Sequence, residues 1–420
     1  MVATTAALPS SASTEKLTPE AQELETILDD NLIGKKRRKL LVAQTAPSVR
    51  VAFSELVGEA PGSFDTGVLV ASLKELGFDF VLDTNTAADL TICEEGTELL
   101  HRIMERERLK EEGRNAEEAE EPLPLFTSCC PNWMNMVAKT APDLVQYIST
   151  CKSPHMMYGA IVKRNSEALF GCPPESIYTC SVMPCIKKRG ESDHREFSKN
   201  GIRDVDNVIT TKDLGVLLKK HDIDPRELKS EPFDSPFQNE GSSDDPSGMG
   251  TGAGQLFGAT GGVMEASVRS VYELVTGTQL PRLELEEVRG FEGLKEATVP
   301  LYNKETGKGL DIELRVAVIN GLGQAKKLIK KMKDGEVKYD FVEVMACPGG
   351  CIGGGGQPKS DREMLERRME YLYNLDKSLP IRRSHENPTV KKLYDTVLGK
   401  EYGSAEAKEQ LHVKQVYGET

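Results

Sequence analysis

The sequence has few cysteines, no long apolar run and no excess of basic residues. Nine cysteines in 420 residues is a sparse and odd number. No secretory signal precedes them, so a disulfide framework is a poor explanation and a reducing compartment is expected. No segment is long and apolar enough to cross a bilayer. The 53 basic and 66 acidic residues give a net charge of −13, which argues against nucleic acid or an anionic membrane as the principal partner.

The pattern of apolar runs predicts an α/β fold. Runs rich in branched residues alternate with longer helical patterns, and the predicted strands are 49–53, 78–82, 123–127, 177–183, 314–319 and 341–345. We expect residues 1–38 to form a flexible N-terminal arm whose opening stretch is at best the remnant of an organellar transit peptide. We expect α/β lobes at 39–190 and 191–360, with the functional site between them. Amphipathic helices at 361–420 should wrap around this body.

Three separated segments, at residues 127–131, 183–185 and 345–351, carry cysteines next to predicted strands. The ends of strands are where open sheets usually bind ligands. A cubane iron–sulfur cluster needs four thiolates and accepts widely separated donors, and the candidates are Cys130, Cys185, Cys347 and Cys351. A structural zinc site is the alternative. Zinc usually takes two tight cysteine pairs, however, and only the last two of these residues could form such a pair.

The third segment continues into a glycine-rich loop that ends at Pro358. Six glycines around Cys347 and Cys351 would let the backbone approach a bulky inorganic group and offer amide donors to it. The loop matches neither the G-x-G-x-x-G nor the G-x-x-x-x-G-K-[ST] pattern, and residues 250–262 do not supply either one. Nucleotide binding is therefore a poor explanation for this loop.

At this level of detail the chain resembles the FeFe-hydrogenases. The three signatures of that family are matched by Thr127-Ser-Cys-Cys-Pro-Asn-Trp133, Met183-Pro-Cys-Ile-Lys-Lys188 and residues 345–358. The similarity also includes residues 45–50, 257–265 and 385–388, so it covers most of the chain. The resemblance implies an enzyme that reversibly combines two protons and two electrons into dihydrogen.

The resemblance also implies the cofactor, an H-cluster in which a 4Fe–4S cubane is joined to a diiron subsite with carbon monoxide, cyanide and azadithiolate ligands. The four cysteines named above would hold the cubane, and Cys351 would also bridge to the diiron subsite. The family places further side chains against this cofactor: Pro47, Ser48, Ser153, His155, Met183, Lys188, Phe257 and Met345. For the two methionines and the phenylalanine, ordinary core packing is the alternative. Lys188 would bind a cyanide through its ammonium group. His155 stands where the family usually has glutamine. It could titrate near neutrality, and the alternative is that it only preserves a polar contact.

A proton path is implied in the same way, and it consists of Cys129, Glu95, Glu98, Arg102 and Ser149. Cys129 adjoins a ligand and would be redundant as a second one, so a free thiol that relays protons is the expected role. The alternative for this cysteine is a small buried side chain. For the acidic residues and the arginine, which share a helical face by their spacing, the alternative is a solvated stripe of ion pairs.

No ferredoxin-like cysteine run precedes the three segments, so electrons should arrive directly. This layout resembles the compact hydrogenases of green algae. It implies a plant-type 2Fe–2S ferredoxin as electron donor, dedicated maturation proteins, a monomer and a place in the chloroplast stroma. A basic patch should receive the acidic ferredoxin. The candidates are the lysines between 326 and 333 and the pair Arg367 and Arg368, of which we prefer the pair because it follows the cluster loop.

The alternative function is a hydrogenase-like scaffold protein that carries iron–sulfur clusters for assembly or sensing and makes no hydrogen. The presence of Cys129 and Lys188, the intact glycine loop and the absence of an extra N-terminal cysteine cluster favour catalysis.

Overall fold

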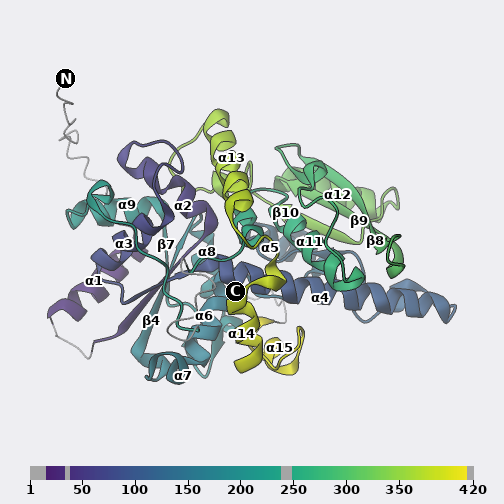
Figure 1. Cartoon of the computed structure of the whole chain (residues 1–420), viewed down its shortest axis with the longest axis horizontal. Coiled ribbons are helices and arrows are strands. Elements are labelled where there is room, and N and C mark those ends of the chain that lie inside the picture. The colour runs from purple at the N-terminus through teal and green to yellow at the C-terminus, as the bar shows by residue number, and fades with distance from the viewer. Residues whose placement is uncertain (1–15, 34–37, 238–247, 414–420) are drawn as a thin grey trace.

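The computed structural model describes residues 16–33, 38–237 and 248–413, and these form a mixed α/β fold built on two four-stranded sheets (Figure 1). The first sheet is parallel, has the order β2-β1-β4-β7 and consists of β1 (Leu40–Thr45), β2 (Phe80–Asp83), β4 (Ile177–Met183) and β7 (Asn207–Thr210). The second has the order β3-β10-β9-β8 and consists of β3 (Leu125–Phe126), β8 (Leu294–Asn303), β9 (Lys308–Asn320) and β10 (Phe341–Met345). In it β3, β10 and β9 are parallel, and β8 is antiparallel to β9. Strands β5 (Ser198–Lys199) and β6 (Ile202–Arg203) form a small antiparallel pair.

Helices surround the two sheets and fill the space between them. They are α1 (Pro19–Ile33), α2 (Pro47–Phe53), α3 (Thr66–Leu76), α4 (Thr84–Glu111), α5 (Pro131–Thr140), α6 (Pro154–Arg164), α7 (Ser166–Phe170), α8 (Lys187–Ser192), α9 (Thr211–Lys220), α10 (Gly252–Gln255), α11 (Gly262–Thr276), α12 (Leu322–Lys333), α13 (Arg362–Ser378), α14 (Pro388–Thr396) and α15 (Ala405–Leu411). The long α4 packs against α6 beside the first sheet and against α11 beside the second, so it joins the two halves of the molecule.

The division between the sheets does not follow the predicted boundary between residues 190 and 191. Strand β7 and helix α9 lie beyond residue 191 but belong with the first sheet, whereas β3 at Leu125–Phe126 pairs with β10 of the second sheet. The chain therefore crosses between the halves more than once. Strand pairing is decided by long-range hydrogen bonds, which local sequence patterns do not reveal.

One predicted strand, at residues 49–53, is instead the helix α2. Pro47 occupies its first turn, where a missing backbone N–H costs nothing. Val49 and Phe53 are four residues apart and lie in one buried core cluster, as expected for one face of a helix. The strand of this region is β1, directly before the helix, and five of its six residues are buried. A short apolar run does not by itself distinguish a buried strand from a buried helix.

The predicted N-terminal arm is partly structured. Residues 1–15 and 34–37 lie outside the described residues, but α1 is packed on the body, with Ala21 and Leu24 fully buried. Tyr178 donates a hydrogen bond to Glu23 at 3.1 Å, and Thr18 donates one to Asp213 at 3.0 Å. These long-range contacts correct the expectation that residues 1–38 form a flexible arm, because α1 buries apolar side chains against the first sheet.

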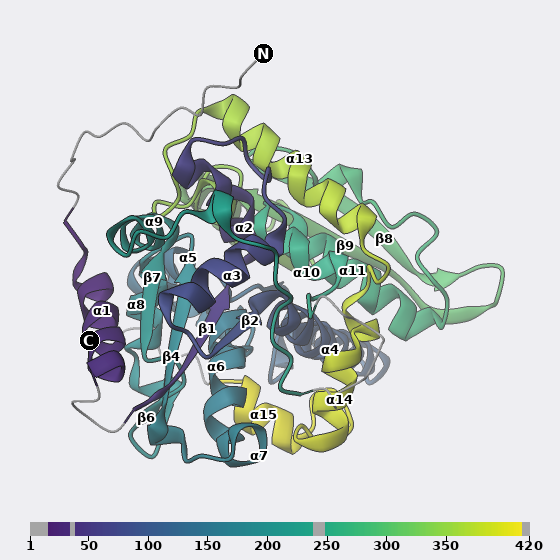
Figure 2. The same ribbon diagram turned by 60° about the vertical axis from the view of Figure 1, so that its left-hand side comes forward.

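The described part of the C-terminal region, from residue 361 to residue 413, contains the helices α13, α14 and α15. Figure 1 shows α13 between the two halves, and Figure 2 shows α14 and α15 beside α6 and α4. Helix α13 buries Leu365, Met369 and Leu372 in a cluster with Ile352, whereas α15 buries Ala407 and Leu411. Among the helices of the described ranges, none has both the length and the apolar character needed to cross a membrane.

Candidate metal centre

The four candidate ligand cysteines follow strands of both sheets. Cys130 comes after β3 and caps the N-terminus of α5, Cys185 comes after β4, and Cys347 comes after β10. Cys351 begins the short 3₁₀ helix η9 (Cys351–Gly353). Because β3 and β10 are parallel neighbours, the segments that carry Cys130 and Cys347 leave the second sheet at the same edge. The sheets thus bring the ligands of three distant segments to one place.

The electrostatics of the four thiols show that they lie close together. Burial and, to a smaller extent, the sulfurs of Cys130 and Cys185 together raise the pKa of Cys347 to about 11. The pKa of Cys351 is raised by burial and by the other three cysteines. Ionised thiols crowded in this way repel one another, and a bound metal cluster relieves that repulsion because a coordinating thiol is deprotonated. The donor set therefore fits an iron–sulfur cubane.

The glycine loop approaches the surrounding backbone closely. At Gly350, φ is +95°, and a Cβ atom would lie 2.6 Å from the Thr260 nitrogen. At Gly354, a Cβ atom would lie 2.5 Å from the Pro184 oxygen. Any side chain at these positions would push the loop away from the segments that it joins. In the described structure the glycines thus bring Cys351 against the segment that carries Cys185.

Arg368 of α13 holds this loop, although the sequence suggested it as a docking residue. Its side chain is fully buried in an ion pair with Glu55. Arg368 Nη1 donates to the Ile352 oxygen at 2.6 Å, and Nη2 donates to the Pro358 oxygen at 3.1 Å. A buried guanidinium with these partners cannot meet a protein surface, so the preference for Arg367 and Arg368 as a docking pair was wrong. Neither residue spacing nor composition signals this role.

Lys188 lies beside Cys129 and the cluster cysteines. Its ammonium donates to the Cys129 carbonyl oxygen at 2.7 Å and to Glu191 Oε2 at 2.8 Å. Burial lowers the pKa of Lys188, but the Glu191 carboxylate and the Cys129 and Cys351 sulfurs outweigh burial and raise it overall. Lys188 therefore stays charged, and it can donate to an anionic ligand.

His155 shares the Glu191 carboxylate with Lys188. His155 Nε2 lies 3.0 Å from Glu191 Oε2, and Nδ1 lies 3.3 Å from Ser181 Oγ. Burial lowers the pKa of His155 although Glu191 opposes the shift. This imidazole is therefore neutral at pH 7, which corrects the expectation that it titrates near neutrality. Glu191 was not identified from the sequence, although its position three residues after Lys188 on one helix could have signalled the pair.

A chain of buried side chains leads from α4 to Cys129. Arg102 Nη2 donates to Glu98 Oε1 at 2.6 Å, and Ser149 Oγ donates to Glu98 Oε2 at 2.9 Å. The Ser149 hydroxyl lowers the pKa of Glu95, and the Glu95 carboxyl raises the pKa of the Cys129 thiol, so these three groups lie near one another. Glu95, Glu98 and Arg102 are all buried, which excludes the solvated stripe of ion pairs. Hydrogen bonds therefore connect Arg102, Glu98 and Ser149, and the Glu95 carboxyl and the Cys129 thiol lie close enough to influence each other's surroundings.

Both inner groups of this chain hold protons at neutral pH. Burial, reinforced by the Glu98 carboxylate, raises the pKa of Glu95 to about 8. Burial also raises the pKa of Cys129 well above its usual value, and Glu95 adds to that shift whereas Lys188 opposes it. A neutral carboxyl beside a neutral thiol can donate and accept protons without placing a charge in the interior.

The remaining predicted contact residues are buried around the same centre or near it. Phe257 and Met345 pack in a cluster that Cys129 and Cys351 join, whereas Met183 packs in the core of the first sheet. The other members of the set lie at the first turns of α2 and α6: Pro47, Ser48 and Ser153.

The hydroxyl groups of the two serines support a polar ligand. Ser48 Oγ and Ser153 Oγ are buried, and neither has a hydrogen-bond partner among the described residues. The Ser48 carbonyl accepts a hydrogen bond from Gln357 Nε2 at 2.5 Å, which ties α2 to the end of the glycine loop. Buried polar groups are rarely left without partners, so these hydroxyls fit a cofactor with polar ligands.

Taken together, the fold and the site define an iron–sulfur protein with a four-thiol centre between two sheets and a group of buried polar side chains beside it. Comparison with known sequences agrees with this class. The profile of the family "Iron only hydrogenase large subunit, C-terminal domain" matches residues 39–355, and that of the iron hydrogenase small subunit matches residues 362–415. The chain belongs to the iron-only hydrogenase family.

Individual relatives support the same assignment. The NADP-reducing hydrogenase subunit HndD of Solidesulfovibrio fructosivorans is 45% identical over 86% of this chain and 58% of its own length. Iron hydrogenase 1 of Clostridium pasteurianum is 38% identical over 91% of the chain and 62% of its own length. The chain thus spans less than two thirds of these relatives.

A solved structure matches nearly end to end. FeFe-hydrogenase HydA1 of Chlamydomonas reinhardtii, in its E141A variant, has a TM-score of 0.78 and 44% sequence identity, covering 93% of this chain and 98% of that one. A more distant group of relatives includes Protein NAR1 of Arabidopsis thaliana, which is 29% identical over 92% of this chain.

Proposed function

We propose that the protein is an FeFe-hydrogenase that reversibly reduces protons to dihydrogen at an H-cluster. The observation that carries the proposal is the junction of two features at Cys129. Cys129 interacts electrostatically with the cluster cysteines Cys130 and Cys351 and also with Glu95. Beside Glu95 lies Ser149, which hydrogen-bonds Glu98. A purely structural metal site would need the thiols but would have no use for a proton path that ends beside them.

The residues present can hold the cofactor. Cys130, Cys185, Cys347 and Cys351 would bind the 4Fe–4S cubane. When bound, the H-cluster supplies the hydrogen chemistry, with a diiron subsite that carries carbon monoxide, cyanide and azadithiolate ligands. Lys188 stays charged and offers a strong donor to an anionic ligand.

The network on α4 moves the protons. Arg102 fixes one oxygen of the Glu98 carboxylate, and Ser149 contacts the other at 2.9 Å. Protons pass from Glu98 through Ser149 to Glu95, and from Glu95 to the Cys129 thiol. The raised pKa values of Glu95 and Cys129 keep both groups protonated at neutral pH. Each is therefore ready to donate as soon as its neighbour can accept a proton.

We infer that a plant-type 2Fe–2S ferredoxin delivers the electrons, that maturation proteins install the diiron subsite and that the protein works as a monomer in the chloroplast stroma. The resemblance to compact algal hydrogenases supports these assignments. With Arg368 buried, the exposed lysines of α12 become the candidate docking surface: Lys326, Lys327, Lys330, Lys331 and Lys333. Helix α12 packs on β10, the strand that leads to Cys347. A basic face there can attract an acidic partner close to the cluster.

The test is hydrogen evolution by matured protein from a reduced low-potential dye. Infrared bands of iron-bound carbon monoxide and cyanide show that the diiron subsite is present. Cys129→Ala should lower turnover by about 10²–10⁴-fold, since it removes a proton donor, and it should keep the iron content. Cys172→Ala, which removes a thiol outside the network, is the control. A fully matured protein with these bands and no hydrogen evolution would contradict the proposal.

The second candidate is an iron–sulfur assembly role, which the similarity to Protein NAR1 favours. Higher identity to hydrogenases and the HydA1 structure weigh against it. The two functions differ in one observable: an assembly protein would transfer or carry iron–sulfur clusters, and it would show no carbon monoxide or cyanide bands after incubation with the maturation proteins.

A further inference from the structure

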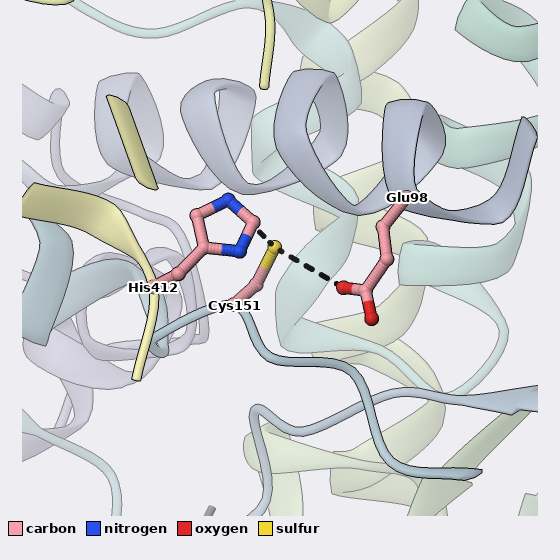
Figure 3. A group of neighbouring side chains, drawn as sticks. All are labelled: Glu98, Cys151 and His412. Carbon is pink, nitrogen blue, oxygen red and sulfur yellow. Dashed lines mark hydrogen bonds between the residues drawn. The ribbon is translucent and has the colours of Figure 1, made fainter. Parts of the chain in front are cut away.

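A second group of metal-ligating side chains lies outside the four-cysteine centre. Glu98 of α4, Cys151 before α6 and His412 after α15 each place one ligand atom within 4.8 Å of the other two (Figure 3). Cys151 Sγ is 3.9 Å from Glu98 Oε2 and 3.9 Å from His412 Nε2. The three residues come from distant parts of the sequence, so only the tertiary structure brings them together.

The backbone holds this group firmly. Cys151 and His412 face each other across an isolated antiparallel bridge, and the Val413 amide donates to the Thr150 oxygen at 2.8 Å. Thr150 Oγ1 lies 2.7 Å from His412 Nδ1. A histidine that binds a metal through one ring nitrogen usually has its other nitrogen in such a hydrogen bond, which orients the ring.

The charges around the group favour a cation. Burial raises the pKa of Cys151 well above its usual value, and the neighbouring acidic side chains, Glu98 first, raise it further. Glu94 Oε2 lies 2.7 Å from His412 Nε2, so a further carboxylate oxygen is within reach of the same space. Buried carboxylates need a counter-charge, and a metal ion that replaces the thiol proton supplies one while it offsets the charge of the new thiolate.

The donor atoms select the kind of cation. Magnesium and calcium prefer sites made of oxygen atoms alone, whereas one sulfur, one imidazole nitrogen and one carboxylate oxygen suit zinc. Around a tetrahedral zinc ion, a sulfur and an oxygen or nitrogen ligand lie about 3.5 Å apart, given bond lengths of about 2.3 and 2.1 Å. The observed separations of 3.9 Å need only a small contraction. His412 is the most exposed of the three side chains, at 11%, so an ion from solvent can reach the group at this residue.

We propose that Glu98, Cys151 and His412 bind a divalent cation of the zinc class, and that this cation blocks proton transfer through Glu98. On binding, the Cys151 thiol releases one proton to solvent, and its thiolate coordinates the ion. The Glu98 oxygen that receives the ion is the one that contacts Ser149. A carboxylate that neutralises a dication no longer accepts the proton. Zinc binding stands on the structure alone, whereas the block of turnover rests on the proposed function.

Binding is tested on protein that holds the cubane but no diiron subsite, so that the four cluster cysteines are occupied. Zinc(II) is added, and bound zinc is counted after equilibrium dialysis. X-ray absorption at the zinc edge should show one sulfur at about 2.3 Å together with nitrogen or oxygen ligands. Cys151→Ala and His412→Gln should each weaken binding by at least about tenfold, whereas Cys172→Ala should bind as the unmodified protein does. Zinc without a sulfur ligand, or equal affinity in all variants, would overturn the site.

The block is tested on fully matured protein by hydrogen evolution from a reduced dye. Zinc(II) should inhibit the unmodified protein and Cys172→Ala at concentrations that leave His412→Gln active. Equal inhibition of all three, or zinc bound without inhibition, would overturn the block. If the matured protein makes no hydrogen, the proposed function fails, but the dialysis experiment still shows whether the three residues bind zinc. The two failures are therefore distinguishable.

Discussion

Replacing Arg368 with methionine should destabilise the protein strongly and hinder assembly of the cubane. The Arg368 side chain is fully buried, and its partner Glu55 is only 7% exposed. Loss of the guanidinium leaves that carboxylate buried without its counter-charge, which typically costs about 3–5 kcal/mol of unfolding free energy. The carbonyl oxygens of Ile352 and Pro358 lose their donor as well. The glycine loop that carries Cys351 then loses its attachment to α13.

The neighbouring Arg367 provides the matched control. It is 57% exposed and pairs with Glu363 one turn earlier, so Arg367→Met should change the unfolding free energy by about 0.5 kcal/mol or less. Urea unfolding measures the unfolding free energy of each variant. Iron and sulfide analysis after reconstitution measures how well each variant retains the cubane. The reasoning is refuted if the two unfolding free energies agree within about 0.5 kcal/mol.

A double variant separates the lost charge pair from the lost attachment. Adding Glu55→Gln to Arg368→Met removes the uncompensated carboxylate, so it should recover about 1–3 kcal/mol of the loss. Cubane retention should stay low, because the loop carbonyls still have no donor. If both stability and cubane retention recover, the defect of Arg368→Met comes from the unpaired Glu55 carboxylate and not from the lost hydrogen bonds to the loop.

Three further predictions concern the proton path and its surroundings. Ser149→Ala should cut hydrogen evolution by about 10²–10⁴-fold at unchanged iron content, since it breaks the link between Glu98 and Glu95; a loss below about twofold would contradict the path. The folded protein keeps the Glu95 proton up to a pKa of about 8, against an ordinary value of 4.5, so stability should fall as pH rises between these values. Glu95→Gln should flatten that part of the unfolding profile, and an unchanged slope would count against the raised pKa. His155→Gln should leave the pH dependence of turnover between about pH 7 and 8 unaltered, because burial lowers the pKa of His155 from its usual value of 6.5; a changed profile in this range would argue otherwise.

Local patterns predicted the elements that carry most of the ligands. The runs at 177–183 and 341–345 are continuous stretches of mainly apolar residues, as expected for parallel strands covered on both faces, and the structure has β4 and β10 with these bounds. The run at 49–53 did not follow this pattern, because Pro47 starts a helix there and the strand precedes it. Helix α1 was not predicted from the sequence, because its apolar face is narrow and its packing partners lie in distant segments.

Sequence patterns alone could not predict pairing, burial or protonation. Strand β3 belongs to the second sheet, although the strands before and after it in the chain, β2 and β4, both belong to the first sheet. Arg367 and Arg368 look alike in the sequence, yet one is exposed and the other is buried in an ion pair. Long-range contacts decide which side of a helix meets the core, and burial in turn decides the pKa of each group.

The sequence by itself determined the type of chemistry. Three cysteine segments and a glycine loop specify thiolate ligands and close backbone approach, because these properties belong to the residue types and their spacing. Only the tertiary structure decided how these parts act together. It placed Cys129 between the four thiols and the network on α4, and it brought His412 from the end of the chain to Glu98 and Cys151. Such meetings depend on packing between elements far apart along the chain, and no local pattern encodes them.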